Sequence, residues 1–172
     1  MSVRQDADQI MRSALRAVLP DAAVIKALKE IRLGPGRLVL VAVGKAAYQM
    51  AETAMDQLGG RVHSGVVITK YEHSKGSLPP LTVYEAGHPV PDENSYRATQ
   101  AAIDAVSGLS AQDTVLFLLS GGGSALFEKP LIAPKDLERL TGELLACGAD
   151  IVEMNTVRKR FSAVKGGKFA AL

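Results

Sequence analysis

The sequence contains one cysteine and no tryptophan, and aromatic residues make up only 5% of its 172 residues. The lone Cys147 cannot form an internal disulfide, and no second cysteine or histidine lies at metal-ligand spacing from it. A disulfide-stapled scaffold and a zinc-finger site are therefore excluded. We expect Cys147 to be a small buried hydrophobic residue.

Long hydrophobic runs are also missing. The longest, residues 38–43 and 115–119, fall far short of the ~18 residues that span a bilayer. The first ten residues alternate charge and polarity and show no secretory h-region. We therefore expect a cytoplasmic protein that does not contact membranes.

The sequence also has no large excess of charge of either sign, because 20 Lys and Arg are balanced by 18 Asp and Glu, which gives a formal net charge of +2. The basic residues form no dense run, which argues against nucleic acid as a partner. With 47% hydrophobic and 22% charged residues, the composition is that of an ordinary globular protein. Its length suits one domain, residues 1–172, with one core.

Short apolar runs alternate with helical patterns along the chain. The patterns predict strands over 38–43, 65–69, 81–85 and 114–119, and helices over 6–19, 21–31, 46–58, 93–106, 134–147 and 150–164. Such alternation is typical of a Rossmann-like α/β fold, a three-layer α/β/α arrangement around a mostly parallel sheet. We further expect Asp21 to cap the second helix, Asp92 or Asn94 to cap the helix over 93–106, and the first two helices to pack.

Two of the predicted strands end in glycine-rich turns, Gly44-Lys45 and Ser120–Ser124. In open α/β sheets the ligand crevice lies beyond the carboxyl ends of the strands, so both turns are expected to face one site. Successive glycines aim backbone N–H groups at an anion, and the residues of the second turn that offer them or a hydroxyl are Ser120, Gly121, Gly122, Gly123 and Ser124. The alternative is a tight turn without a ligand.

Lys45 follows a strand and precedes a helix, the usual position of a phosphate-binding cation, although a solvated surface lysine fits equally well. Neither turn has the spacing of a P-loop. The G-x-G-x-x-G fingerprint with an acidic residue ~20 positions further on is also missing. These absences argue against a standard nucleotide-binding motif and against a hydride-transfer function.

The predicted last helix separates into two stripes. One is apolar, and the other carries Asn155, Arg158, Ser162 and Lys165, with Lys168 just beyond. This densest basic stretch is either a binding face or a solvated one. His88, between Gly87 and Pro89, either hydrogen-bonds a substrate or is an ordinary loop histidine. His63 and His73 have no visible partner.

Several segments together resemble one known family. They are VAVGKAAYQMAETA (41–54), GVVITK (65–70), EAGHPVPDENS (85–95), LLSGGGSALFEKP (118–130) and CGADIVEMNTVRKRFSAVKGGKFA (147–170). They are similar to the N-terminal part of the glycerate 2-kinases that carry a C-terminal MOFRL domain. The resemblance implies ATP-dependent phosphorylation of D-glycerate to 2-phosphoglycerate, with Mg²⁺, in a cleft between two domains.

By the same resemblance, Lys45 in its Gly44-Lys45 turn and the loop Ser120–Ser124 match active-site elements. Arg158 is then a second catalytic cation, and Asn155, Lys165, Lys168 and His88 bind substrate or nucleotide. No metal ligand or general base is identified. Relatives continue far beyond Leu172, so we expect a fragment with an incomplete sheet, no MOFRL domain, doubtful activity alone and a tendency to form homo-oligomers.

Two other functions remain open. Some family members are labelled hydroxypyruvate reductases, which would use NAD(P)H. A glycine loop on a Rossmann-like sheet also suits a non-catalytic module that binds phosphosugars or other anions.

Overall fold

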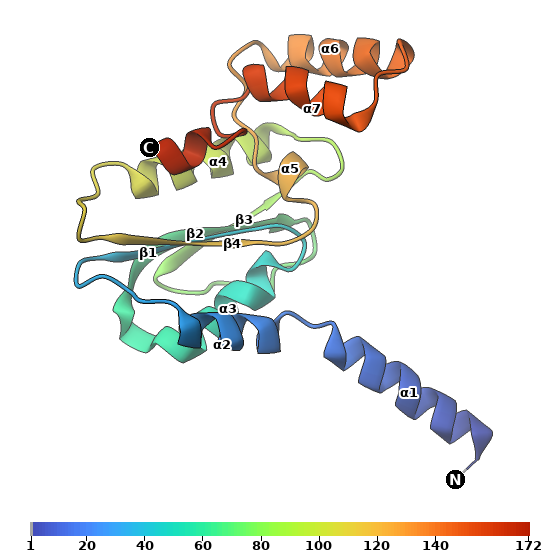
Figure 1. Ribbon diagram of the computed structural model, residues 1–172, viewed down its shortest axis with the longest axis vertical. Helices are drawn as coiled ribbons and strands as arrows, with labels where there is room; N and C mark the ends of the chain where they lie inside the picture. The colour runs from blue at the N-terminus through green and yellow to red at the C-terminus, as the bar shows by residue number, and fades with distance from the viewer. Residues whose placement is uncertain (1) are drawn as a thin grey trace.

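The computed structural model describes residues 2–172 and is built around a four-stranded parallel sheet (Figure 1). Its strands lie in the order β3-β2-β1-β4, with β1 paired to β2 and β4, and β2 to β3. The strand bounds are β1 Leu38–Val43, β2 Val62–Lys70, β3 Leu81–Ala86 and β4 Thr114–Leu119. The predicted α/β class and parallel sheet are confirmed.

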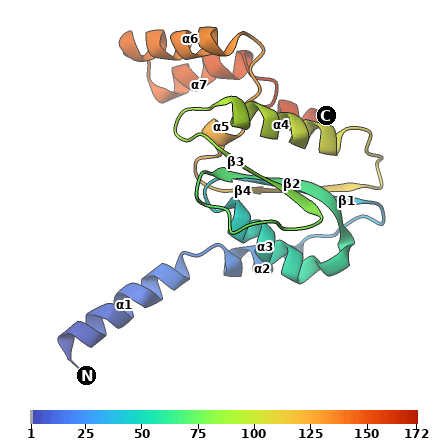
Figure 2. The ribbon, with the colours of Figure 1, turned by 180° about the vertical axis from the view of Figure 1, so that it is seen from behind.

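Helices cover both faces of the sheet, which makes three layers (Figures 1 and 2). The helices α2 and α3 lie on one face, and α4 and α5 lie on the other. The helical bounds are α1 Val3–Ala17, α2 Asp21–Glu30, α3 Ala47–Leu58, η1 Gly59–Arg61, α4 Glu93–Val106, α5 Gly123–Leu126, α6 Pro134–Ala146, α7 Ile151–Arg160 and η2 Lys168–Ala171.

The strand β1 is the centre of the core. Every one of its residues is at most 1% exposed. Leu38, Leu40 and Ala42 pack on the side of α2 and α3. Its other three residues pack on the side of α4. The continuous apolar run therefore has the burial on both faces that parallel strands require.

Helix α4 begins where its sequence supplies a cap. The Asp92 carboxylate accepts a hydrogen bond from the Ser95 N–H at 2.9 Å, and the Ser95 hydroxyl contacts the Asp92 N–H in return. Such a capping box satisfies N–H groups that the first helical turn leaves unpaired. Of the two caps that the sequence allowed, Asp92 is the one used.

The N-terminal helices differ from the prediction. Helix α1 projects away from the sheet, and none of its residues is buried (Figure 1). Helix α2 alone packs on α3. Asp21 is the first residue of α2 and not its cap, and its carboxylate instead accepts hydrogen bonds from Gln49 Nε2 at 2.6 Å and Thr53 Oγ1 at 3.1 Å. No helix within residues 2–172 has the length and apolarity to cross a membrane.

Two predictions near the C-terminal end are wrong. Helix α7 stops at Arg160, because the chain after it pairs with residues 129–131: the Leu131 N–H donates to Phe161 O at 2.8 Å, and the Ala163 N–H to Lys129 O at 2.8 Å. Cys147 is exposed, because it follows the end of α6 in a hairpin that projects beyond the sheet (Figure 2). Residue type alone does not show that this hairpin leaves the core.

Two glycines in different surroundings, Gly65 in the sheet and Gly142 in α6, predict opposite effects of an alanine substitution on stability. A Cβ added at Gly65 in β2 would collide with the Leu40 carbonyl oxygen and lie 2.8 Å from Leu81 Cδ2. Gly65→Ala should therefore lower the free energy of unfolding by about 1–3 kcal/mol. Gly142→Ala, in α6 with nothing within 4 Å of the added Cβ, should raise it by about 0.5–1 kcal/mol. Urea unfolding measures both, and a Gly65→Ala protein as stable as wild type would contradict the packing argument.

Candidate functional site

The two glycine turns lie side by side. Because β1 and β4 are parallel neighbours with Val43 opposite Leu119, their carboxyl ends meet at one edge of the sheet. The Lys45 N–H donates to Gly121 O at 2.8 Å, and the Ala46 N–H donates to Ser120 Oγ at 3.0 Å. The two turns that the sequence placed at one crevice thus touch each other.

Positive φ angles and close contacts with neighbouring loops explain why glycine occupies positions 44 and 122. Gly44 has a φ of +123°, and a Cβ there would lie 2.6 Å from the Ser120 carbonyl oxygen. Gly122 has a φ of +87°, and a Cβ there would lie 2.9 Å from His88 Nε2 and 3.3 Å from Lys45 Cγ. The side chains of Lys45 and His88 therefore both lie against Gly122, which gathers three separate loops at one place.

Two features of these loops suit an anion. The Lys45 side chain runs over the second turn, with its Cε 3.8 Å from a Cβ built on Gly121, and no carboxylate within residues 2–172 pairs with its ammonium. The N–H groups of Gly121 and Gly122 also have no hydrogen-bond acceptor in the described chain. An exposed cation beside two available N–H donors is an arrangement that binds phosphate or carboxylate oxygens.

The loop that carries His88 is held by Asp92. The Asp92 carboxylate accepts a hydrogen bond from Tyr71 Oη at 2.6 Å, besides its bond to the start of α4. Partial burial opposes ionisation of Asp92, but hydrogen bonds from Tyr71, Ser95 and Gly87 outweigh it and lower its pKa. The ionised carboxylate thus connects the loops after β2 and β3, and this connection fixes the backbone on which His88 sits.

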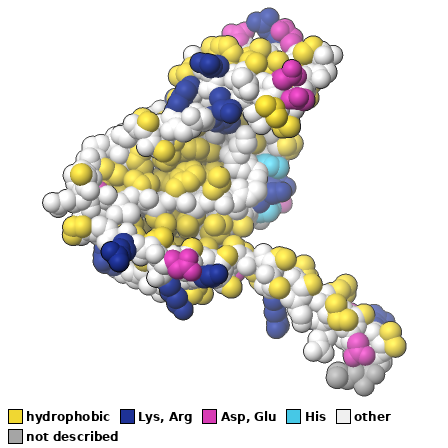
Figure 3. All heavy atoms as spheres, viewed as in Figure 1, with side chains coloured by type: hydrophobic (Ala, Val, Ile, Leu, Met, Phe, Trp, Pro, Cys, Tyr) yellow, Lys and Arg dark blue, Asp and Glu magenta, His cyan; other side chains and the backbone are white. Residues whose placement is uncertain are grey.

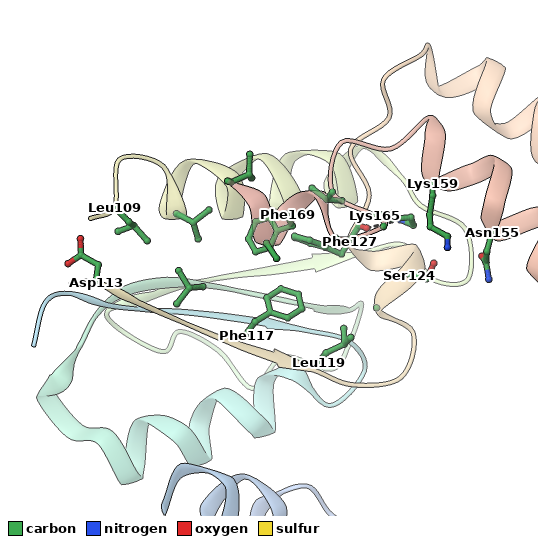
Figure 4. A pocket seen from close by; sticks show the side chains of 18 of the residues that line it. Leu109, Asp113, Phe117, Leu119, Ser124, Phe127, Asn155, Lys159, Lys165 and Phe169 are labelled. Atoms are coloured by element: carbon green, nitrogen blue, oxygen red, sulfur yellow. Dashed lines mark hydrogen bonds between the residues drawn. The ribbon is translucent and has the colours of Figure 1, made fainter. Parts of the chain in front are cut away.

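The predicted polar stripe of the last helix does not form as one face, because α7 ends before Ser162 and Lys165. Asn155 lies on α7 near Ser124 and Lys159 at one end of a groove (Figure 4). Lys168 instead donates to the carbonyl oxygens of Lys159 at 2.9 Å and Ser162 at 2.6 Å. Its ammonium therefore stabilises the turn after α7.

Glu128, which the sequence analysis did not single out, forms an ion pair with the predicted site residue Lys165. Its side chain is 1% exposed, and its Oε2 lies 2.6 Å from Lys165 Nζ, which also donates to Phe127 O at 2.9 Å. Burial lowers the pKa of Lys165, while the charge of Glu128 opposes that shift and nearby Arg158 adds to it. The only sequence signal was a carboxylate inside the apolar segment ALFEKP, and nothing local indicated its partner 37 positions away.

Arg158 lies close to this ion pair. It is half-buried, and its Nε has no hydrogen-bond partner among residues 2–172. Glu128 forms an ion pair with Lys165, and no ion pair within residues 2–172 includes Arg158, which lies in the last turn of α7.

A groove of about 900 Å³ runs beside the free edge of β4. Val115, Phe117 and Leu119 of β4 line it, together with Phe127 and Phe169, and Figure 3 shows apolar side chains gathered over this face. Ser124, Asn155, Lys159 and Lys165 form its polar end (Figure 4). Lys45 and His88 do not line it, so the groove adjoins the glycine turns but is distinct from the Lys45 crevice.

The fold and the crevice define a Rossmann-like protein with a lysine and a glycine loop at the switch between β1 and β4. Residues 6–172 match the family profile described as a domain of unknown function, DUF4147. The chain belongs to this family.

Named relatives agree with the resemblance seen in the sequence, which is thereby confirmed. The chain is 50% identical to D-glycerate 2-kinase of Thermotoga maritima over 171 residues, 98% of this chain and 40% of the relative. It is 42% identical to a putative hydroxypyruvate reductase of Agrobacterium vitis over 99% of this chain and 39% of the relative. It also superposes on the crystal structure of the Thermotoga maritima glycerate kinase with a TM-score of 0.90, covering 96% of this chain and 40% of that one. The chain thus spans about two fifths of the length of these relatives.

Breaking the buried ion pair should be costly. Glu128→Gln keeps the shape but leaves the Lys165 ammonium without its compensating charge, so the free energy of unfolding should fall by about 3 kcal/mol near neutral pH. Because the variant lacks the Glu128 charge, which in wild type opposes the lowering of the Lys165 pKa by burial, its folded state binds the Lys165 proton less tightly than folded wild type. The deficit should therefore shrink as pH rises toward the ordinary pKa of lysine.

The matched control is Glu143→Gln, which removes an exposed carboxylate 3.6 Å from Arg139 and should change stability by at most about 0.5 kcal/mol. Urea unfolding at several pH values tests both variants. Equal stability of the two variants would show that the Glu128–Lys165 pair contributes nothing.

Proposed function

We propose that this chain supplies catalytic residues for the ATP-dependent phosphorylation of D-glycerate to 2-phosphoglycerate. The observation that carries the proposal is the convergence of the unpaired Lys45 ammonium with the free N–H groups of Gly121 and Gly122 at the ends of β1 and β4. The names of the kinase relatives support the same reaction. The transfer would take place where a further part of the protein closes over this crevice.

Phosphoryl transfer needs little covalent help from a protein, since catalysis is mostly positioning and neutralisation of charge on the phosphoryl oxygens. In this proposal the Lys45 ammonium holds oxygens of the transferring group, and the Gly121 and Gly122 N–H groups orient them. Arg158 offers a second cation, and His88, against Gly122, is placed to hydrogen-bond a substrate oxygen. Asn155 and Ser124 would contribute polar contacts from the adjoining groove.

ATP fits the donor set of the crevice, because a polyanionic phosphate chain matches an unpaired cation and free N–H groups. Mg²⁺ would accompany the ATP phosphates and neutralise their charge. Within residues 2–172 no group of three or more His, Cys, Asp and Glu side chains is placed to hold a metal. We therefore assign no Mg²⁺ ligand.

Removing the Lys45 charge tests the proposal most directly. Lys45→Met keeps an apolar stem over Gly121 and Gly122 but removes the ammonium, so kcat/KM of the full-length gene product should fall about 10²- to 10³-fold with no loss of folding. Lys29→Met, at an exposed position in the last turn of α2, is the control and should behave like wild type. Phosphorus NMR identifies the product as 2- or 3-phosphoglycerate.

The outcomes separate the alternatives. A Lys45→Met protein with normal turnover removes Lys45 from the mechanism. NAD(P)H oxidation with hydroxypyruvate, in place of glycerate phosphorylation, would point to the reductase. Phosphate or sugar-phosphate binding by calorimetry without any turnover would point to a binding module.

We also propose that the 172-residue chain self-associates through the apolar edge of β4. Leu119 is 60% exposed and Val115 39%, and an unpaired edge strand with apolar side chains favours pairing with another chain. Light scattering should show a mass that rises with concentration, and Val115→Lys should suppress the rise. Leu145→Lys, at an exposed apolar position on α6, should not suppress it. A constant monomer mass for the wild-type chain would overturn the proposal.

A further inference from the structure

The imidazole of His73 lies against the backbone of the turn that carries Lys45. Its Nδ1 is 3.0 Å from the Lys45 carbonyl oxygen. Because a carbonyl oxygen only accepts hydrogen bonds, Nδ1 must carry the proton and donate it. A histidine that appeared unpartnered in the sequence is thus bonded to the residue on which the proposed chemistry depends.

The Lys45 carbonyl has few other potential partners. Helix α3 begins at Ala47, so the Lys45 peptide lies outside its regular hydrogen bonding. On the opposite side, the Lys45 N–H is bonded to Gly121 O at 2.8 Å, and the following N–H to Ser120 Oγ at 3.0 Å. The glycine loop therefore fixes the N–H side of this turn, and His73 fixes its carbonyl side.

His73 is itself anchored by a neighbouring strand. Glu85, near the end of β3, accepts hydrogen bonds through Oε1 from the His73 N–H at 3.1 Å and the Ser74 N–H at 2.9 Å. The same loop carries Tyr71, which is bonded to Asp92 in the loop of His88. The loop after β2 thus connects the turn of Lys45 with the loop of His88.

We propose that His73 is a positioning residue for Lys45. The bond from its Nδ1–H to the Lys45 carbonyl holds the peptide so that the side chain stays extended over Gly121 and Gly122. The effect on turnover rests on the proposed kinase function. The effect on the Lys45 side chain does not.

The choice of substitutions separates positioning from mere packing. In His73→Asn the amide nitrogen can take the place of Nδ1, whereas in His73→Gln it takes the place of Nε2. In the full-length gene product, His73→Asn should keep kcat within about threefold, and His73→Gln should lower kcat about 10- to 10²-fold with a smaller change in KM for glycerate, since a small misplacement of a catalytic group carries such a cost. His63→Gln, at an exposed position of β2, is the control and should leave kcat unchanged.

A second readout does not need turnover. Trinitrobenzenesulfonate modification of Lys45, followed by peptide mass spectrometry, reports how the amine is presented, and inorganic phosphate at the crevice should protect it. Wild type and His73→Asn should be protected equally, and His73→Gln at least severalfold less. If wild type fails to phosphorylate glycerate while this pattern holds, the kinase proposal fails and the positioning role stands.

The opposite results are equally clear. Equal kcat and equal protection in His73→Asn and His73→Gln would overturn the positioning role, whether both variants match wild type or both are impaired to the same extent. Circular dichroism spectra and urea unfolding show whether each variant folds. If His73→Gln does not fold, protection of Lys45 by phosphate is compared between wild type and His73→Asn, where equal protection supports the role and unequal protection overturns it.

Discussion

The parallel pairing of β1 with β2 on one side and β4 on the other is the constraint on which the rest of the structure depends. It buries β1 on both faces, which demands an uninterrupted apolar strand. It also brings the carboxyl ends of β1 and β4 to the same edge, at matching register. Without that pairing, Gly44-Lys45 and the glycine loop would be two unrelated turns.

Charge compensation separates the lysines of this region into two groups. The Lys165 ammonium pairs with the buried carboxylate of Glu128, and the ammonium of the exposed Lys168 donates hydrogen bonds to main-chain oxygens; both stabilise the chain that follows α7. Lys45 has no such partner in the described chain. A lysine whose ammonium is already bonded to the chain is mainly structural, whereas the unpaired ammonium of Lys45, beside free N–H groups, is available to a ligand.

The loops after the strands give the site its shape through side chains that bond backbone groups. Asp92 connects the start of α4 with Tyr71, Glu85 holds the backbone of His73, and His73 reaches the Lys45 carbonyl. The Tyr71–Asp92 and His73–Lys45 bonds join loops that follow different strands, and Glu85 in β3 anchors the loop after β2. The crevice is therefore built where the loops after all four strands meet, and its geometry depends on the contacts between them.

By itself the sequence determined the elements whose signal is local. The apolar runs over 38–43 and 114–119 predicted β1 and β4 at their observed bounds, Asp92 was one of two residues expected to cap α4, and the glycine turns predicted that Lys45 and the loop Ser120–Ser124 lie at one edge of the sheet. Burial periodicity and capping act within a few residues, so they can be recognised from the order of residues alone.

Only the tertiary structure decided the features that depend on distant partners. The end of α7 at Arg160 is set by pairing with residues 129–131, the burial of Glu128 by Lys165, and the position of His73 by Lys45 and Glu85. The exposure of α1 and of Cys147, at the end of α6, likewise follows from the fact that these two helices project away from the sheet. The physical reason is that a hydrogen bond or ion pair across 12 or more positions leaves no periodicity in the sequence, and exists only once the sheet has brought its two partners together.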